Sequence, residues 1–195
     1  IFGGRRSTTM PLALQSFDWT HGVYLASTLG SETTAAATGA VGVVRRDPMA
    51  MLPFIGYDAG TYFQHWLDMQ SRIPNPPKIF MVNWFRKGAD GKFLWPGYGE
   101  NMRALKWILD RSHSRVGATE TVVGYVPRTE DLNTSGLDVK PEAVSAAMKI
   151  DLAEWQEEIE SQKEWFDKLG ATVPRPLTLQ RELLLERVKA ARAVK

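Results

Sequence analysis

A strongly apolar run, preceded by prolines and followed by turn residues, constrains this sequence more than any other feature. Pro74, Pro76 and Pro77 forbid helix just before the run and favour an extended link. Residues 78–86 are then dominated by large apolar side chains, a composition typical of a β-strand. Residues 88–91 read Gly-Ala-Asp-Gly, a composition typical of a turn, and residues 92–95 then form the returning arm. The pattern therefore predicts a β-hairpin.

Aromatic residues are concentrated in and after this hairpin, beside two glycines, Gly97 and Gly99, and one asparagine, Asn101. Two interpretations are open. In one, the rings form a hydrophobic hairpin core in front of a helix that Asn101 caps. In the other, a flat heteroaromatic ligand stacks between them, and each stacked face contributes roughly 1–3 kcal/mol by analogy with base stacking. The rings in question are Trp84, Phe85, Phe93, Trp95 and Tyr98.

Helical periodicity marks most of the remaining structure, so the fold class is mixed α and β. Helices are predicted over residues 61–70 and, with Asn101 as N-cap, over 101–110. Pro141 suits a first helical turn, and Gly170 is a helix stop. Thr178 is expected to cap the last helix. Strands are expected at residues 41–44 and 121–126. The apolar face of the long C-terminal helix is expected to comprise Leu152, Trp155, Ile159, Phe166 and Leu169, and that of the last helix Leu184, Leu185 and Val188.

Residues 30–42 contain almost no large side chain. Such a segment buries little apolar surface, so it is expected to be mobile or to become ordered only on demand. It is either a surface linker or a lid whose small side chains allow it to close over a ligand.

Composition excludes several classes of protein. The chain has 195 residues and no cysteine, which rules out a disulfide scaffold and any thiolate metal site or nucleophile. No apolar run approaches the roughly 18 residues that a membrane-spanning helix needs. With 24 basic and 22 acidic residues, the net charge of +2 gives no general argument for a nucleic-acid or membrane partner. The composition is that of a cytoplasmic protein, and no residue run has the pattern of a signal peptide.

Few polar residues stand out as candidates for chemistry. Arg5 follows a glycine turn and its planar guanidinium suits phosphate oxygens, although paired arginines such as Arg5 and Arg6 are usually solvated. The segment 88–92 lacks the spacing of a phosphate-binding loop, and Phe93 stands where Ser or Thr would be required. The three histidines do not have metal-ligand spacing. Glu157, Glu158 and Glu160 are expected to form a solvated helix face.

A set of longer motifs, in order, resembles the C-terminal third of the bacterial-type GTP-dependent phosphoenolpyruvate carboxykinases. The resemblance is dense from Ile1 to about Ile108 and continues more weakly through 124–127 and 136–138. The motifs are Phe2-Gly3-Gly4-Arg5-Arg6, Trp19-Thr20-His21-Gly22-Val23, Ser31-Glu32-Thr33-Thr34-Ala35-Ala36-Ala37, residues 47–54, and the run from Lys78 through Asn83-Trp84-Phe85-Arg86-Lys87 to Phe93-Leu94-Trp95-Pro96-Gly97-Tyr98-Gly99-Glu100-Asn101.

The resemblance implies an enzyme that converts oxaloacetate and GTP to phosphoenolpyruvate, GDP and carbon dioxide in gluconeogenesis, using Mn²⁺ and Mg²⁺. Phe85 and Tyr98 would sandwich the guanine, Phe93 would form another wall with Trp84 in support, and residues 98–101 would read the guanine edge. Arg5 would contact the transferring phosphates. No catalytic residue and no metal ligand is expected within these residues. The implied nucleotide site comprises Arg5, Trp84, Phe85, Phe93, Tyr98, Gly99, Glu100 and Asn101, and the implied lid, at about residues 31–43, includes Ser31, Glu32, Thr33, Thr34, Ala35, Ala36 and Ala37.

The resemblance also sets the expected organisation. Residues 1–140 would be the C-terminal part of a nucleotide-binding lobe, with the guanine-binding hairpin and loop at 83–101, and residues 141–195 its terminal helices. The family's phosphate loop, its Mn²⁺ ligands and the arginines that hold phosphoenolpyruvate would lie N-terminal to Ile1. An N-terminal portion is thus expected to be missing, and the chain alone is expected to be inactive. The full-length enzyme is expected to be a cytoplasmic monomer.

Three positions depart from the family pattern: Tyr98 for a usual phenylalanine, Met81 for a histidine, and Ala40 for a lysine. A different class of function is also open. The same aromatics, with Arg86, Lys87 and Lys92, fit a stand-alone purine-nucleotide or single-strand nucleic-acid binding module, although the near-zero net charge argues against strong nucleic-acid binding.

Overall fold

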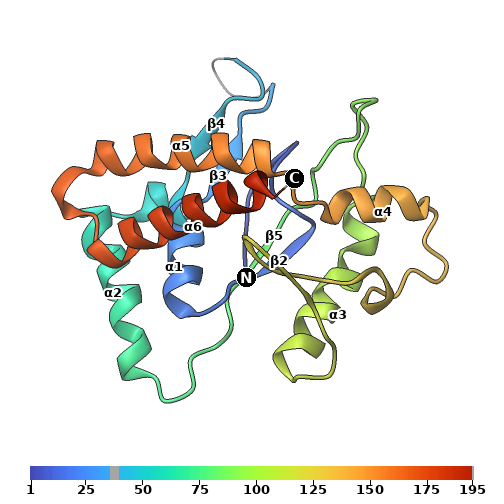
Figure 1. Cartoon of the computed structure of the whole chain (residues 1–195), viewed down its shortest axis with the longest axis horizontal. Coiled ribbons are helices and arrows are strands. Elements are labelled where there is room, and N and C mark those ends of the chain that lie inside the picture. The colour runs from blue at the N-terminus through green and yellow to red at the C-terminus, as the bar shows by residue number, and fades with distance from the viewer. Residues whose placement is uncertain (36–39, 195) are drawn as a thin grey trace.

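A five-stranded mixed sheet organises the chain (Figure 1). The computed structural model describes residues 1–35 and 40–194. The strands lie in the order β1 (Phe2–Gly3), β5 (Phe80–Val82), β2 (Ala13–Gln15), β7 (Gly124–Val126) and β6 (Thr119–Thr121). β1 pairs in parallel with β5, and the other neighbours are antiparallel.

Both faces of the sheet are covered by helices, which confirms the predicted mixed α/β class. Successive side chains of a strand point to opposite faces. Leu14 and Met81 enter one hydrophobic core, whereas Ala13, Phe80 and Val82 enter the other. The central strands β2 and β5 are buried along their whole length, so their side chains are apolar on both faces except for Gln15, whose oxygen accepts from Arg111.

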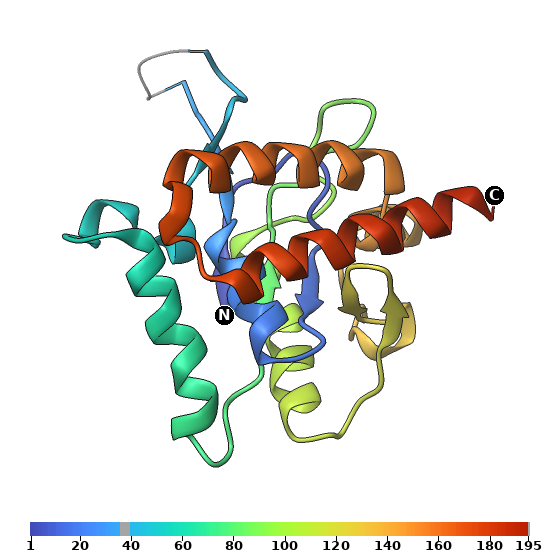
Figure 2. The same cartoon turned by 60° about the vertical axis from the view of Figure 1, so that its left-hand side comes forward.

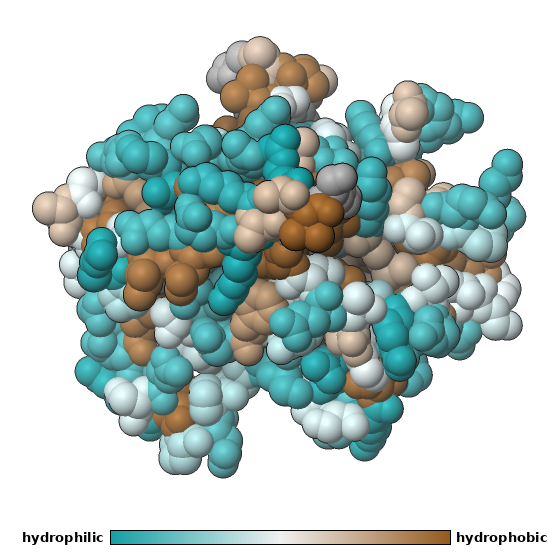
Figure 3. All heavy atoms as spheres, viewed as in Figure 1, coloured by the Kyte–Doolittle hydropathy of each residue, from teal (hydrophilic) through white to brown (hydrophobic). Residues whose placement is uncertain are grey.

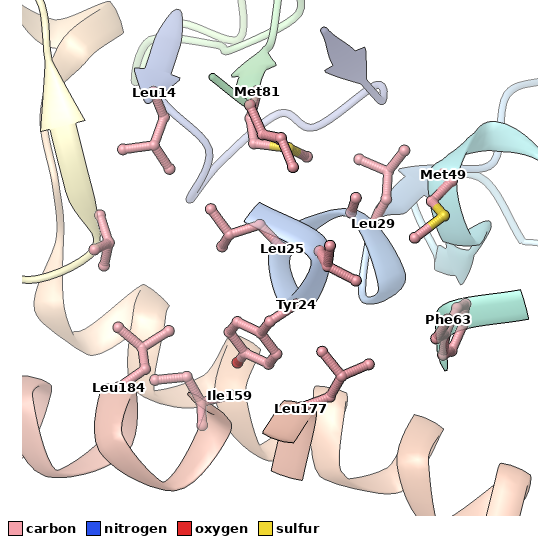
Figure 4. Close-up of a cluster of buried hydrophobic side chains, with 14 of the residues drawn as sticks. Leu14, Tyr24, Leu25, Leu29, Met49, Phe63, Met81, Ile159, Leu177 and Leu184 are labelled. Atoms are coloured by element: carbon pink, nitrogen blue, oxygen red, sulfur yellow. The ribbon is translucent and has the colours of Figure 1, made fainter. Parts of the chain in front are cut away.

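The larger core lies between the sheet and four helices. These are α1 (Trp19–Ser27), α2 (Ala59–Arg72), α5 (Leu152–Leu169) and α6 (Arg175–Ala193). Figure 4 shows Tyr24 and Leu25 of α1 at the centre, Leu14 and Met81 on the sheet side, and Ile159 of α5 on the opposite side. In Figure 2, α5 and α6 run side by side across this layer. The smaller core lies under α3 (Asn101–Ser112) and α4 (Pro141–Met148).

Two features project beyond α5 (Figures 1 and 2). One is a two-stranded antiparallel ribbon made of β3 (Gly30–Glu32) and β4 (Val44–Arg46). The other is the turn that follows β5, around residues 88–92. Figure 3 shows apolar side chains gathered at the tip of the ribbon, above a mostly hydrophilic face, and Val41 and Val43 are exposed there. Short 3₁₀ turns complete the fold at Pro48–Ala50, Leu52–Phe54, Tyr98–Glu100, Thr129–Asp131 and Gly170–Thr172.

Three predicted boundaries are wrong, each for a local reason. The strand expected at 121–126 is a tight hairpin, because Gly124 has φ +139° and the Thr121 hydroxyl donates to its carbonyl. The strand expected at 41–44 begins at Val44, after a turn at Gly42 (φ +83°). Thr178 lies inside the last helix, which already starts at Arg175; its hydroxyl donates to the Arg175 carbonyl. The helices predicted around 61–70 and 101–110, the first-turn position of Pro141 and the stop at Gly170 are confirmed.

Among the described residues, no helix is both long and apolar enough to cross a membrane.

His21 of α1 is a buried histidine that the core holds in its neutral form. The Phe17 amide donates to His21 Nδ1 at 3.1 Å, so the proton of the neutral ring lies on Nε2. That Nε2 is buried and has no hydrogen-bond partner among the described residues. Burial lowers the pKa of His21 to about 4, with a further decrease from Arg187 and an opposing contribution from Asp18.

We predict that His21 makes the fold sensitive to acid. The His21 side chain takes up a proton near pH 6.5 in the unfolded chain but only near pH 4 in the folded chain. The stability that the neutral side chain contributes is therefore fully present above pH 6.5 and is lost as the pH falls from 6.5 to 4. The loss should reach about 3 kcal/mol, at about 1.4 kcal/mol per pKa unit. Urea unfolding from pH 7 to 4 should show a shallower decline for His21→Asn. The exposed His113→Asn is the control; equal slopes for His21→Asn and the parent would contradict the prediction.

Candidate functional site

A glycine turn after β1 places Arg5 at the edge of a small cavity. The turn requires Gly4, because a Cβ there would lie 2.4 Å from the Gly30 carbonyl oxygen. The Arg5 guanidinium carbon lies 4.2 Å from the centroid of the Phe85 ring, a cation–π contact. The cavity has a volume of about 300 Å³ and is lined by Gly3, Gly4, Arg5, Ser31, Val82, Trp84 and Phe85.

The root of the small-residue segment is bonded to this turn. The Arg5 amide donates to the Ser31 hydroxyl at 3.1 Å, and the Glu32 amide donates to the Arg5 carbonyl at 2.8 Å. The Glu32 carboxylate accepts from both the amide and the hydroxyl of Ser7, at 2.7 and 2.8 Å. The structure therefore joins Arg5 and the ribbon, which are about 25 residues apart in sequence.

The predicted lid residues that the structure describes occupy different parts of the ribbon. Ser31 and Glu32 belong to strand β3 and therefore to the root of the segment. Thr33 closes the neck: its amide donates to the Val43 carbonyl and its hydroxyl to the Ala40 carbonyl, at 2.9 and 2.5 Å. Thr34 and Ala35 follow as exposed residues. Ala36 and Ala37 lie outside the described residues.

A buried ion network lies directly beneath the ribbon. Glu158 of α5 accepts from Arg6 Nη2 at 2.6 Å through one carboxylate oxygen and from Arg46 Nη1 at 2.5 Å through the other. Arg46 also donates to the Thr28 carbonyl and the Ser161 hydroxyl. All three charged side chains are less than 10% exposed. The expected solvation of Arg6 and Glu158 is therefore wrong, whereas Glu157 and Glu160 are exposed as predicted.

The two arginines determine the charge state of Glu158. Burial alone would raise the pKa of this carboxyl, but the charges and hydrogen bonds of Arg6 and Arg46 outweigh burial and hold the pKa below its usual value. The carboxylate is ionised at neutral pH and compensates two buried cations.

The predicted aromatic hairpin forms after β5. Lys87 and Phe93 pair across it in antiparallel fashion, and the Leu94 amide donates to the Arg86 carbonyl at 2.9 Å. The Phe85 and Phe93 rings meet edge to face with centroids 6.1 Å apart. Trp84 is half-buried beside them, whereas Tyr98 is 97% exposed. The structure thus brings Arg5, Phe85 and Phe93 together and leaves the Tyr98 ring free in solvent.

Asn101 does not cap its helix through its side chain. It is the first residue of α3, and Glu100 occupies the N-cap position without a side-chain hydrogen bond. Asn101 Oδ1 instead accepts from the buried indole Nε1 of Trp95 at 2.9 Å. An indole N–H can only donate, so it fixes the amide with Oδ1 towards Trp95 and leaves the Nδ2 group as a donor. Gly97, with φ +96°, makes the turn that leads from Trp95 into the 3₁₀ turn Tyr98–Glu100 and so to Asn101.

Sequence reasoning gave no role to two residues at this site. Asn83 joins the hairpin to the Arg5 turn: its Oδ1 accepts from the amides of Arg6 and Phe85, and its Nδ2 donates to the carbonyls of Arg6 and Met10. Arg46 holds the end of the ribbon. Arg6, the partner of Asn83, and Glu158, the partner of Arg46, lie 77 and 112 residues away, so no local pattern signals these two contacts.

The described part of the chain holds no group of three or more histidine, aspartate or glutamate side chains that could bind a metal ion.

Comparisons with a family model and with curated proteins point to the same family. Residues 1–187 match the family model of the phosphoenolpyruvate carboxykinase C-terminal P-loop domain. The chain is 74% identical over 195 residues to phosphoenolpyruvate carboxykinase (GTP) of Anaeromyxobacter sp. (strain K), covering all of this chain and 33% of that protein. The proteins of the same name from Renibacterium salmoninarum and Corynebacterium jeikeium are 54% and 50% identical, over 96% and 98% of this chain and 31% and 32% of their own lengths. The chain therefore spans about a third of the curated relatives it matches.

We predict that Glu158 is a major contributor to stability. Glu158→Ala leaves two buried cations uncompensated and should reduce the free energy of unfolding by about 3–5 kcal/mol, whereas the exposed neighbour Glu157→Ala should change it by less than about 0.5 kcal/mol. Glu158→Gln keeps one acceptor oxygen but turns an NH₂ donor towards the other arginine, and should fall between them. Urea denaturation of the three variants measures the differences, and similar midpoints for Glu158→Ala and Glu157→Ala would refute the network's role.

Proposed function

Because the chain belongs to the phosphoenolpyruvate carboxykinase family, we propose that it forms the guanine pocket, a phosphate-contacting arginine and the active-site lid of a GTP-dependent enzyme. The complete enzyme would convert oxaloacetate and GTP to phosphoenolpyruvate, GDP and carbon dioxide in the cytoplasm. The observation that carries the nucleotide part of this proposal is the Trp95–Asn101 hydrogen bond.

The bond supports selection of guanine over adenine. Guanine carries an acceptor oxygen at position 6, whereas adenine carries a donor amino group there. With Oδ1 held by Trp95, the Asn101 side chain offers Nδ2, a donor, to an approaching base edge. The first turn of α3 adds backbone N–H donors at the same place. These groups match a 6-oxo purine and oppose a 6-amino purine.

The aromatic hairpin supports stacking of the same base. Phe85 and Phe93 pair edge to face on the hairpin, and the exposed Tyr98 ring is free to cover the other face of a bound guanine. The hydroxyl of Tyr98, at a position where the resemblance implies phenylalanine, leaves that stacking face unchanged.

Arg5 and the ribbon would serve the transferring phosphates. The Arg5 guanidinium lines the cavity next to the hairpin, where it would neutralise charge that develops during phosphoryl transfer. Residues 33–43, rooted on Arg5 and Ser7, would close over the cavity and shield the enolate intermediate from protonation by solvent. The described residues do not fit a Mn²⁺ or Mg²⁺ site, so we derive no step through a metal and propose that the rest of the enzyme supplies those ligands.

We predict that Asn101→Asp weakens the preference for GTP. The aspartate can still accept from Trp95 but presents an acceptor to the base, so the ratio of GTP to ATP affinity should fall by at least about tenfold, since a lost or repelled hydrogen bond is worth 1.4 kcal/mol or more. Tryptophan fluorescence titration with each nucleotide measures the ratio. Asn75→Asp in the exposed proline-rich link is the matched control. An unchanged ratio in Asn101→Asp would exclude this asparagine as the selector.

Salt dependence separates this proposal from a nucleic-acid binding module. GTP binding in a defined pocket should change by less than about tenfold between 50 and 200 mM salt, whereas single-strand binding that neutralises several phosphates falls far more steeply. Tight, strongly salt-dependent binding of oligonucleotides together with weak binding of GTP would favour the binding module.

A further inference from the structure

Arg86 is a buried cation that the proposed function does not use. Its side chain is 7% exposed, and Nη1 donates to the Lys149 carbonyl at 2.6 Å. Nη2 lies 3.7 Å from a carboxylate oxygen of Glu154. Lys149 and Glu154 flank the junction between α4 and α5, more than 60 residues further along the chain. Arg86 thus ties the aromatic hairpin to the helical part of the fold.

The backbone around Arg86 is held on both sides. The Arg86 carbonyl accepts from the Leu94 amide across the hairpin, and the next amide, of Lys87, donates to the Ser7 carbonyl at 2.9 Å. Adjacent side chains on such an extended segment point in opposite directions. Phe85 accordingly lines the cavity together with Arg5, while Arg86 enters the α4–α5 junction behind it.

The carboxylate of Glu154 links this anchor to the Arg5 turn. The oxygen that faces Arg86 also accepts from the Thr9 amide at 2.8 Å. Burial lowers the pKa of Arg86, opposed by the charges of Glu154 and Asp151. A cation in this position is costly unless each contact is made, so it favours a single arrangement of the hairpin against the helices.

We propose that Arg86 is a positioning residue for base recognition: by holding its arm of the hairpin against the α4–α5 junction, it orients the Phe85 ring on which the purine stacks. This inference rests on the proposed role of the hairpin as the guanine pocket. Arg86 acts through Phe85 without touching the nucleotide. Loss of the Arg86 side chain should therefore raise the KM for GTP and leave the KM for oxaloacetate and kcat almost unchanged.

The test uses the full-length enzyme that carries this chain, with steady-state kinetics in GTP and in oxaloacetate. Arg86→Gln should raise the KM for GTP by about tenfold, because partial loss of a base–aromatic stacking contact changes affinity by this order. The kcat and the KM for oxaloacetate should stay within about twofold. Arg86→Lys keeps one donor for the Lys149 carbonyl and should recover part of the loss.

Two further variants decide between explanations. Val188→Ala, in the fully buried part of α6, lowers stability away from the hairpin and should leave the KM for GTP unchanged. Phe85→Leu removes the stacking ring itself and should raise the KM for GTP. If Phe85→Leu has no effect, the guanine pocket is wrong. If Phe85→Leu raises the KM but both Arg86 variants behave like Val188→Ala, or lose kcat instead, the positioning role is overturned.

Discussion

The ionised carboxylate of Glu158, buried between Arg6 and Arg46, is the interaction on which the arrangement of the site depends. Removing three charges from water costs several kcal/mol for each ion, and this cost is offset only when all the partners are correctly placed. Those partners come from the turn that carries Arg5, from the end of the ribbon and from helix α5. One set of contacts therefore fixes three segments that are remote in sequence. For this reason the proposed phosphate-contacting arginine and the proposed lid are both held by the same ion network.

A second polar junction joins this ion network to the aromatic hairpin. The side-chain amide of Asn83 uses both its oxygen and its nitrogen to bind the Arg6 backbone, and it also binds the Phe85 amide. The two halves of the candidate site, one proposed for phosphate and one proposed for a purine, are thereby fixed relative to each other. Arg86 holds the hairpin from the opposite side. The rings of Phe85 and Phe93 are thus supported by polar contacts that lie behind them, whereas Tyr98 remains free to adjust.

Local patterns predicted the elements that packing merely reinforces. The hairpin follows from an apolar run and a glycine turn, and the helices around 61–70 and 101–110 follow from spacing alone. The same reasoning failed for Glu158, because it assigned glutamates to the solvent-facing side of the helix. Yet Glu158 lies on the same helix face as Trp155, Ile159 and Phe166, and that position could have indicated its burial. Asn101 was expected as a cap because a helix start ordinarily needs one, but its side-chain oxygen accepts a hydrogen bond from the buried indole of Trp95 instead.

The sequence by itself determined the fold class, most helices, the hairpin and, through its long motifs, the family, because these depend on contacts between near neighbours or on residue identity. It could not determine which charges are buried. That decision belongs to the tertiary structure: an arginine or glutamate is stable in the interior only when a partner from elsewhere in the chain is present, and the partners of Glu158 lie more than 100 residues away. Only the folded chain brings them together, and with them the site.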